Sequence, residues 1–445
     1  MISMDRHSID ATEDNQRQSF RARWVFPLSG PPLENATVEV VGGRISAVHT
    51  RSDPGARDLG NCAIIPGLIN AHTHLELSDV VSPLRPAQPF TAWLREVMRH
   101  RRQRTETGLK DSTTNQHSHD HSAIGKIIAE GIAESSDSGT TTIGDIAGPV
   151  PGLARASEYQ AMSDIQPRSV AFLELLGLAP ERMEEHLQRG RAHLAGDDSP
   201  LRNGPVIRGL SPHAPYSVHP ELFRELVNLA VARCAPIAMH LAETRDELQL
   251  LHDGTGPFVT FLEELGVWRP EAIPRGSRPL DYLRELARAE TALAIHGNYL
   301  AADEVDFLAA HPNISIVYCP RTHAYFRHAE HPWRTLLAKG VNVALGTDSR
   351  ASNPDLSLWN ELLFLRKLAP DFDPAVLLEL GTWNGALSLG LGHEMGTLEV
   401  GKSADLTLVD FAESDAAGPF ERLFNPRNRI AGTVCRGRGI GSHSA

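Results

Sequence analysis

Several polar side chains in this sequence are of the types that bind divalent metals, and each one closes a short apolar run. His72 and His74 are two residues apart, so on a strand both side chains would point to the same face. His240 and Asp348 end two later runs. Because imidazole and carboxylate groups bind zinc and also suit iron, we predict that these four residues hold one divalent metal, zinc before iron, that activates water. The alternative is four ordinary packed residues, which would leave a buried histidine cluster with unpaired polar groups.

Three further residues are placed to move protons or to contact a substrate. Glu243 follows His240 by three positions, where a carboxylate could take a proton from the activated water and pass it to the substrate. His296 could hydrogen-bond that water or a tetrahedral intermediate, and His213 could meet the substrate. The alternatives are a glutamate favoured at the start of a helix and two packed histidines.

Eight apolar runs alternate with longer charged stretches that are typical of helices. Buried parallel strands have continuous apolar sequences, and alternation with helices implies repeated strand–helix units. Eight units close a TIM barrel, an α/β fold whose active sites lie at the carboxyl ends of the strands. The alternative is an open, doubly wound sheet. The runs are Ile64–Ala71, Thr140–Ile146, Val170–Leu176, Val206–Leu210, Pro236–His240, Ala292–His296, Ser315–Cys319 and Val341–Gly346.

Both ends of the chain are rich in strand-like segments, which predicts a small β-sandwich domain built from residues 21–65 and 391–440. The barrel would then span residues 66–390, and the polar residues 1–20 would form a flexible start. Residues 105–122 are rich in Thr, Ser, Asn, Gln and His, so we expect a flexible inserted loop there. The alternative is an accessory metal site. The strand-like segments at the two ends are 36–41, 44–48, 397–400 and 404–409.

The composition favours a small-molecule substrate. The chain has 445 residues and a formal net charge of −12, which repels nucleic-acid phosphates. Its four cysteines form no CxxC pair, which argues against a disulfide scaffold and against a thiolate zinc site. No apolar run approaches the ~18 residues of a membrane helix, and no apolar secretory segment is visible near the start. We therefore expect a cytoplasmic protein with no nucleic-acid or membrane partner.

Four segments of the chain resemble the amidohydrolase superfamily, in its branch of cytosine, guanine and adenosine-type deaminases and chlorohydrolases. They are Pro66–His74, Ser211–Tyr216, His240–Thr244 and Gly346–Ser349. The flanking segments 41–45 and 396–406 are similar to the split β-sandwich of that branch. The resemblance extends over residues 21–435.

The resemblance implies a role for each residue already singled out. In the family, the residues that match His72, His74, His240 and Asp348 bind zinc or iron, the match of Glu243 shuttles protons, and the match of Asp348 also accepts a proton from the water. The match of His296 assists, and the match of His213 contacts the substrate. Two-metal members carry a carboxylated lysine on strand four, whereas residues 206–210 contain no lysine, so we expect one metal. A homodimer is expected from the resemblance alone.

One segment departs from the pattern of the branch. After strand seven the branch usually has Pro-x-Ser-Asn, whereas this chain has Pro320-Arg321-Thr322-His323. Together with Trp93 in the segment 90–94, this segment resembles aminodeoxyfutalosine deaminases, whose substrate carries an adenine-type ring and a benzoate carboxylate. Arg321 could pair with that carboxylate and Trp93 could pack on a ring, with His323 and Glu174 as further substrate contacts. The alternative is that Arg321 pairs with a protein carboxylate such as Glu174 and that the aromatic residues belong to the core.

The sequence thus predicts a metal-dependent hydrolase that releases ammonia from an aminated purine-type ring. The expected substrate is a modified adenosine of the aminodeoxyfutalosine, S-adenosylhomocysteine or methylthioadenosine type. The nearest alternative is another hydrolysis at the same site, by a guanine, pterin or cytosine deaminase, an amide hydrolase or a chlorohydrolase. An alternative of another class is a non-catalytic binding or scaffold protein on a decayed barrel, against which the intact metal ligands and Glu243 argue.

Overall fold

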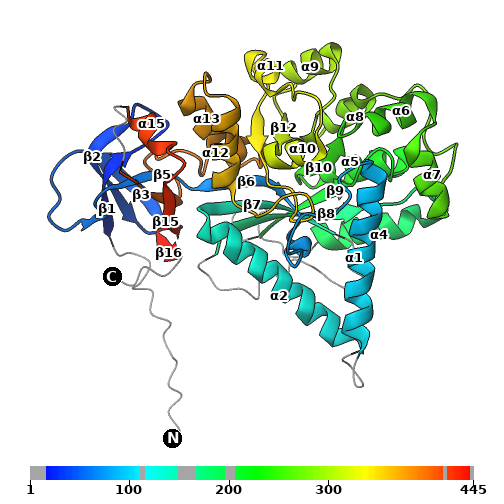
Figure 1. The fold of residues 1–445 in the computed structure, drawn as a ribbon, viewed down its shortest axis with the longest axis horizontal. Helices are drawn as coiled ribbons and strands as arrows, with labels where there is room; N and C mark the ends of the chain where they lie inside the picture. The colour runs from blue at the N-terminus through cyan, green and yellow to red at the C-terminus, as the bar shows by residue number, and fades with distance from the viewer. Residues whose placement is uncertain (1–16, 111–115, 149–165, 196–205, 414–417, 441–445) are drawn as a thin grey trace, which may run out of the picture.

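Two β-sheets organise the molecule, one forming a barrel and the other a smaller sheet built from both ends of the chain (Figure 1). The computed structural model describes residues 17–110, 116–148, 166–195, 206–413 and 418–440. The barrel sheet consists of β6 (Leu68–Thr73), β7 (Thr140–Ala147), β8 (Arg168–Leu175), β9 (Val206–Pro212), β10 (Ile237–Leu241), β11 (Ala292–His296), β12 (Ile314–Tyr318) and β13 (Val343–Leu345).

The barrel strands follow their order along the chain, and all neighbouring pairs are parallel. The ring closes where Thr347 and Asp348 donate their backbone N–H groups to the His72 carbonyl, at 3.0 and 3.1 Å. Thr73 also pairs with Asp348 in a parallel bridge. The predicted TIM barrel is therefore confirmed, and its closure brings His72 and Asp348, the first and last predicted metal ligands, side by side.

Helices connect the barrel strands and cover the barrel with one apolar face each. In α5 (Pro220–Ala232), for example, Leu222, Leu226 and Ala230 recur every four residues and are buried. The other helices are α1 (Phe90–Lys110), α2 (Gln116–Asp137), α4 (Met183–Leu194), α6 (Arg245–Asp253), α7 (Pro257–Glu264), α8 (Pro279–Leu286), α9 (Ala302–Ala309), α10 (Pro320–Phe326), α11 (Trp333–Ala338), α12 (Leu358–Leu368), α13 (Pro374–Leu380), α14 (Trp383–Ser388) and α15 (Pro419–Leu423), with short 3₁₀ turns η2 (Leu75–Leu77) and η3 (Pro180–Arg182).

The first apolar run, Ile64–Ala71, is two strands rather than one. Residues up to Pro66 belong to β5 (Cys62–Pro66) of the small sheet, and β6 of the barrel starts at Leu68. Gly67 separates them at a point of close approach, since a Cβ there would lie 2.2 Å from Thr141 Oγ1. A larger residue would clash, so glycine is needed where the chain passes from one sheet to the other.

The small sheet joins strands that are far apart in the sequence. β5 lies between β1, to which it is parallel, and β14, to which it is antiparallel. Side chains from both ends of the chain, among them Val38, Ile45 and Leu406, pack in one apolar core. The segment 397–400, which we expected as a strand, lies outside the strands. The remaining strands are β1 (Gln18–Val25), β2 (Leu33–Val41), β3 (Arg44–His49), β4 (Arg57–Asp58), β14 (Leu406–Asp410), β15 (Arg429–Cys435) and β16 (Arg438–Ile440).

Two local expectations need correction. Residues 105–122 were expected as a loop, but 105–110 end α1 and 116–122 begin α2, while 111–115 lie outside the described residues. The side chains of His117, His119 and His121, the alternative accessory metal site, also lie outside the described part. Within the expected flexible start, residues 18–20 already belong to β1, and 1–16 are not described. Within the described ranges, no helix combines the length and the apolar character that a membrane crossing requires.

Candidate metal centre and active site

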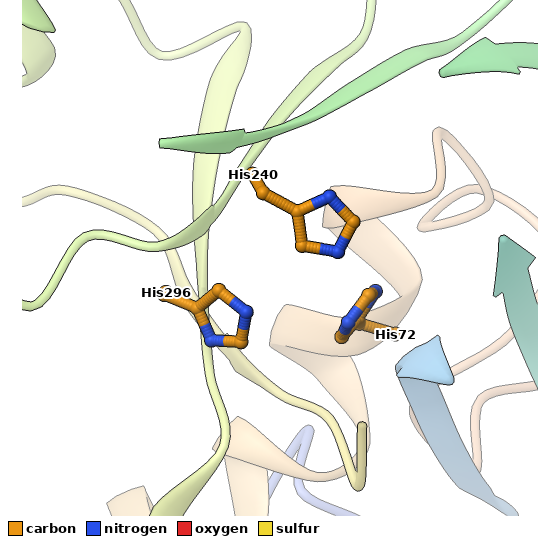
Figure 2. A group of neighbouring side chains, drawn as sticks. All are labelled: His72, His240 and His296. Atoms are coloured by element: carbon orange, nitrogen blue, oxygen red, sulfur yellow. The ribbon is translucent and has the colours of Figure 1, made fainter. Parts of the chain in front are cut away.

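Four side chains converge at the carboxyl ends of β6, β10 and β13. The ligating atoms of His72, His74 and Asp348 all lie within 4.8 Å of one another, and His72 forms a second such group with His240 and His296. His74 Nε2 is 3.3 Å from His240 Nε2, and Asp348 Oδ1 is 3.6 Å from His72 Nε2. Figure 2 shows the rings of His72, His240 and His296 facing one another from separate elements. The structure thus brings together the four predicted ligands.

The hydrogen bonds of these residues fit a divalent metal. His240 Nδ1 donates to the backbone oxygen of His213 at 3.0 Å, which leaves the lone pair of Nε2 facing the site, as is usual for metal-ligating histidines. The separation of 3.3 Å between His74 Nε2 and His240 Nε2 also matches a shared metal, because metal–nitrogen bonds of about 2.0–2.1 Å in tetrahedral geometry place ligand atoms about 3.3 Å apart. His72 Nε2, the nitrogen that faces Asp348, is buried and has no hydrogen-bond partner among the described residues, which is costly without a ligand.

Burial also favours the protonation state that a metal requires. Desolvation, with the neighbouring imidazoles, lowers the pKa of His74 and of His240 well below the usual value. Both rings are therefore neutral near pH 7, and neutral imidazole is the form that binds metals. On the carboxylate, Ser352 Oγ donates to Asp348 Oδ2 at 3.2 Å, so Oδ1 is the oxygen that faces the histidines.

Three residues of the site have left-handed backbone conformations that side chains rarely adopt. Ala242, His296 and Asp348 have φ angles of +53°, +72° and +55°, and each lies at or just beyond the carboxyl end of a barrel strand. Such conformations are unfavourable by about 1–3 kcal/mol each and persist only where the surroundings determine them, typically at functional sites. Three of the eight described non-glycine residues with positive φ thus lie where the predicted catalytic residues are presented.

Glu243 and His296 lie next to each other beside the metal ligands. Glu243 Oε1 is 3.5 Å from His296 Nε2, and both side chains are buried. Burial, with the nearby carboxylates of Asp348 and Glu247, raises the pKa of Glu243 well above its usual value. Burial also lowers the pKa of His296, and His331 Nε2 holds this residue by donating to its backbone oxygen at 2.7 Å. A carboxyl group with a raised pKa can both accept and return a proton near neutral pH.

A cavity of about 510 Å³ extends outward from these residues. Its inner end is polar and contains His213, whose Nε2 is 3.7 Å from Glu174 Oε1; burial lowers the pKa of His213 to about 3. Trp93 lines the wall and donates its indole N–H to the Ala351 oxygen at 3.0 Å. The volume of the cavity is therefore typical of a binding site for a small molecule. Three of the predicted substrate contacts line it: His213, Glu174 and Trp93.

Two other predicted substrate contacts lie elsewhere. Neither Arg321 nor His323 is among the described residues that line the cavity. Arg321 Nη1 pairs with Asp355 Oδ1 at 2.8 Å, and its Nε lies 3.5 Å from the buried Glu361. His323 Nε2 donates to the backbone oxygen of Ala329 at 2.8 Å. Arg321 thus pairs with protein carboxylates, as in the alternative interpretation. Its partners are Asp355 and Glu361, however, and not Glu174.

Three cavity arginines were missed by the sequence analysis: Arg101, Arg182 and Arg269. Arg101 lies on α1, where it forms an ion pair with Glu76. A signal existed for this residue, because the cavity-lining residues of α1 recur at helical spacing from Phe90 through Trp93 and Val97 to Arg101. Arg182 and Arg269 lie on η3 and on the connection between α7 and α8, and their sequence context carries no comparable signal.

Comparison with known proteins finds relatives that match most of the chain. The chain is 29% identical to the 5-methylthioadenosine/S-adenosylhomocysteine deaminase of Moorella thermoacetica, over 89% of this chain and 86% of the relative. It is 29% identical to the aminodeoxyfutalosine deaminase of Deinococcus radiodurans, over 79% and 81%. The solved structure of an adenosine deaminase from Xanthomonas campestris with bound zinc superposes with a TM-score of 0.71 at 23% identity, over 95% of this chain and 92% of that chain.

The family itself is established by the length of the match. The model of the amidohydrolase family matches residues 63–439, which include the barrel, the predicted metal ligands and β14 and β15 of the small sheet. This chain belongs to the amidohydrolase family.

Proposed function

We propose that this protein is a metal-dependent deaminase that uses water to remove the amino group from the adenine-type ring of a modified adenosine. The observation that carries the proposal is the pairing of Glu243 and His296, 3.5 Å apart, beside the four-residue metal site at the inner end of a large cavity. The names of the two relatives support this class of substrate.

The residues divide the reaction between them. His72, His74, His240 and Asp348 would hold one metal, zinc before iron, which would lower the pKa of a water molecule and polarise it. Glu243 accepts the proton of the attacking water and delivers it to the ring nitrogen, while Asp348 assists in removing the water proton. His296 hydrogen-bonds the oxygen that adds to the ring carbon. The second proton of the added oxygen then passes by way of Asp348 to the amino group, the carbon–nitrogen bond breaks, ammonia leaves, and the ring carbon keeps the oxygen as a carbonyl group.

The remaining cavity supports a substrate larger than a free base. Its walls are largely apolar, with Leu94, Val97, Phe261 and Leu262 among the lining residues, which suits an apolar or aromatic substituent. In place of Arg321, the cavity arginines Arg269 and Arg182 are the groups suited to pair with a substrate carboxylate, for which Arg182 would exchange its exposed pair with Glu185 at 3.0 Å.

An ammonia-release screen tests the proposal. Purified protein loaded with zinc or with iron would be given aminodeoxyfutalosine, S-adenosylhomocysteine, methylthioadenosine, adenosine, guanine and cytosine. We expect the highest kcat/KM with one of the modified adenosines. Chloride release from a chlorinated ring without ammonia release from any of these compounds would contradict the proposal. Absence of bound metal together with no turnover after metal addition would favour a scaffold protein.

Substitution of Glu243 tests its role directly. We expect Glu243→Gln to lower kcat by about 10²–10⁴-fold, since this is the usual contribution of a positioned acid or base, while the bound metal and Tm remain close to those of the unmodified protein. Near-normal kcat in this variant would remove Glu243 from the mechanism.

We also propose that the enzyme acts in the cytoplasm as a homodimer, without a nucleic-acid or membrane partner. The net charge of −12 supports the exclusion of nucleic acid. Sedimentation velocity at several protein concentrations would test the dimer, and a single species of 48.6 kDa at all concentrations would contradict it.

A further inference from the structure

The helix that follows the metal ligand His240 begins with an unusual cap. Thr244 is the N-cap residue of α6, and its Oγ1 accepts the N–H of Glu247 at 3.1 Å. A glutamate at the position of Glu247 usually reaches back to the N–H of the cap residue. Here the carboxylate reaches further, because Oε1 accepts the N–H of Ala242 at 2.9 Å and Oε2 accepts the N–H of Glu243 at 2.8 Å. Both oxygens of this buried carboxylate thus hold the segment that carries the proton-transfer residue.

The next strand–helix unit shows the ordinary arrangement. Glu304 occupies the same position in α9 and is also buried. Its Oε2 accepts the N–H of Ala301, the N-cap residue, at 2.8 Å, and its Oε1 accepts the N–H of Leu280 at 3.2 Å. Glu247 and Glu304 are therefore alike in residue type, burial and helix position, but only Glu247 bonds to the backbone of Glu243.

The segment that Glu247 holds is strained and is fixed from two sides. Ala242 has a φ of +53°, which is unfavourable for a residue with a Cβ unless its surroundings determine it. On the side of Glu247, both N–H groups of Ala242 and Glu243 are bound. On the other side, Tyr299 N donates to the Ala242 oxygen at 3.1 Å, and Asn298 Nδ2 donates to the Glu243 oxygen at 3.0 Å. Every backbone polar group of the two residues is thus satisfied.

We propose that Glu247 is a positioning residue that fixes the direction in which the Glu243 side chain leaves the backbone. Without the two bonds to Glu247, the strained turn at Ala242 can relax, and the Glu243 carboxylate leaves its place beside His296. The proposal rests on the proposed role of Glu243 in proton transfer, which the Glu243→Gln variant tests separately.

The test compares Glu247→Gln with Glu304→Gln in the metal-loaded enzyme. The amide of Glu247→Gln keeps one acceptor oxygen but turns an NH₂ group toward a backbone N–H, so one of the two bonds is lost. We expect kcat to fall by about 10–100-fold, because displacements of about 1 Å at a reacting group can reduce rates about 10²-fold, with KM and metal content within twofold of the unmodified protein. For Glu304→Gln we expect a comparable decrease in Tm and a kcat within twofold.

A further substitution separates positioning from stability. Glycine adopts positive φ without strain, so Ala242→Gly in the Glu247→Gln background should raise Tm again without restoring kcat. Asn298→Ala removes the hydrogen bond to the Glu243 carbonyl and should lower kcat at constant KM. This variant tests the proposal if Glu247→Gln does not fold.

Three results would overturn the proposal: a kcat within twofold in Glu247→Gln, a loss accounted for by metal content or KM, or recovery of kcat together with Tm when glycine replaces Ala242. If Glu243→Gln also turned over normally, the proposed function itself would fail, whereas normal kcat in Glu247→Gln alone would remove only the positioning role.

Discussion

The inner and outer ends of the cavity are built by different parts of the fold. At the inner end, the predicted metal ligands and Glu243 sit on or directly after barrel strands, and the backbone there is left-handed at Ala242, His296 and Asp348. At the outer end, Arg182 lies on a short 3₁₀ turn with a side chain 62% exposed, and Arg269 lies on a connection between helices. The barrel thus positions the residues of the proposed chemistry, while the connections contribute Arg182 and Arg269 to the lining of the cavity.

The largest effect that this comparison predicts is at the inner end. We expect Asp348→Asn to abolish stoichiometric metal binding and to lower kcat/KM on the order of 10³-fold for every substrate, because several kcal/mol of electrostatic stabilisation by the metal are lost. Metal analysis and steady-state kinetics would measure both quantities.

Asp355→Asn is a matched control for this variant, because Asp355 pairs with Arg321 and is not among the described residues that line the cavity. Its kcat/KM should stay within threefold. A loss that varied strongly from one substrate to another in Asp348→Asn would show that the two ends of the cavity are not separable.

A smaller and selective effect is expected at the outer end. Replacing both Arg182 and Arg269 with glutamine should raise KM for carboxylate-bearing aminodeoxyfutalosine about tenfold, because charge-assisted hydrogen bonds to the substrate are lost and solvent screening keeps the loss modest. KM for methylthioadenosine, which carries no carboxylate, should be unchanged.

Arg334→Gln serves as the control for the arginine variants, since Arg334 forms an exposed pair with Asp371 and does not line the described cavity. An equal rise in KM for both substrates would contradict selective recognition by the outer end, and so would the absence of any rise.

The smallest effect on catalysis is expected for Arg321, which the sequence analysis had placed among the substrate contacts. Arg321→Met should leave KM for every substrate within twofold, because the side chain pairs with Asp355 and with the buried Glu361. It should nevertheless lower the free energy of unfolding by about 3 kcal/mol, since an uncompensated buried charge remains. Denaturant unfolding would measure this change. A tenfold rise in KM limited to carboxylate-bearing substrates would restore the original assignment.

The difference between barrel strands and connecting segments also explains which residues could be placed from the sequence. The eight apolar runs mark the strands, and a barrel gathers the polar residues at their carboxyl ends, so His72 and Asp348 could be placed together although 276 positions separate them. Arg321 also follows a strand, but its partner Glu361 lies on α12, and the packing of α10 against α12 has no periodic signature. Glu247 was missed for a similar reason, because its role depends on how far its carboxylate reaches back along the backbone.

The position of β5 has a consequence for the order of synthesis. This strand directly precedes β6, yet one of its two neighbours, β14, is made more than 300 residues later. A nascent chain that has already assembled all eight barrel strands therefore still exposes one open edge of β5, and such edges recruit other chains. Premature termination between residues 349 and 405 would thus release a species with every predicted metal ligand present and an aggregation-prone flank.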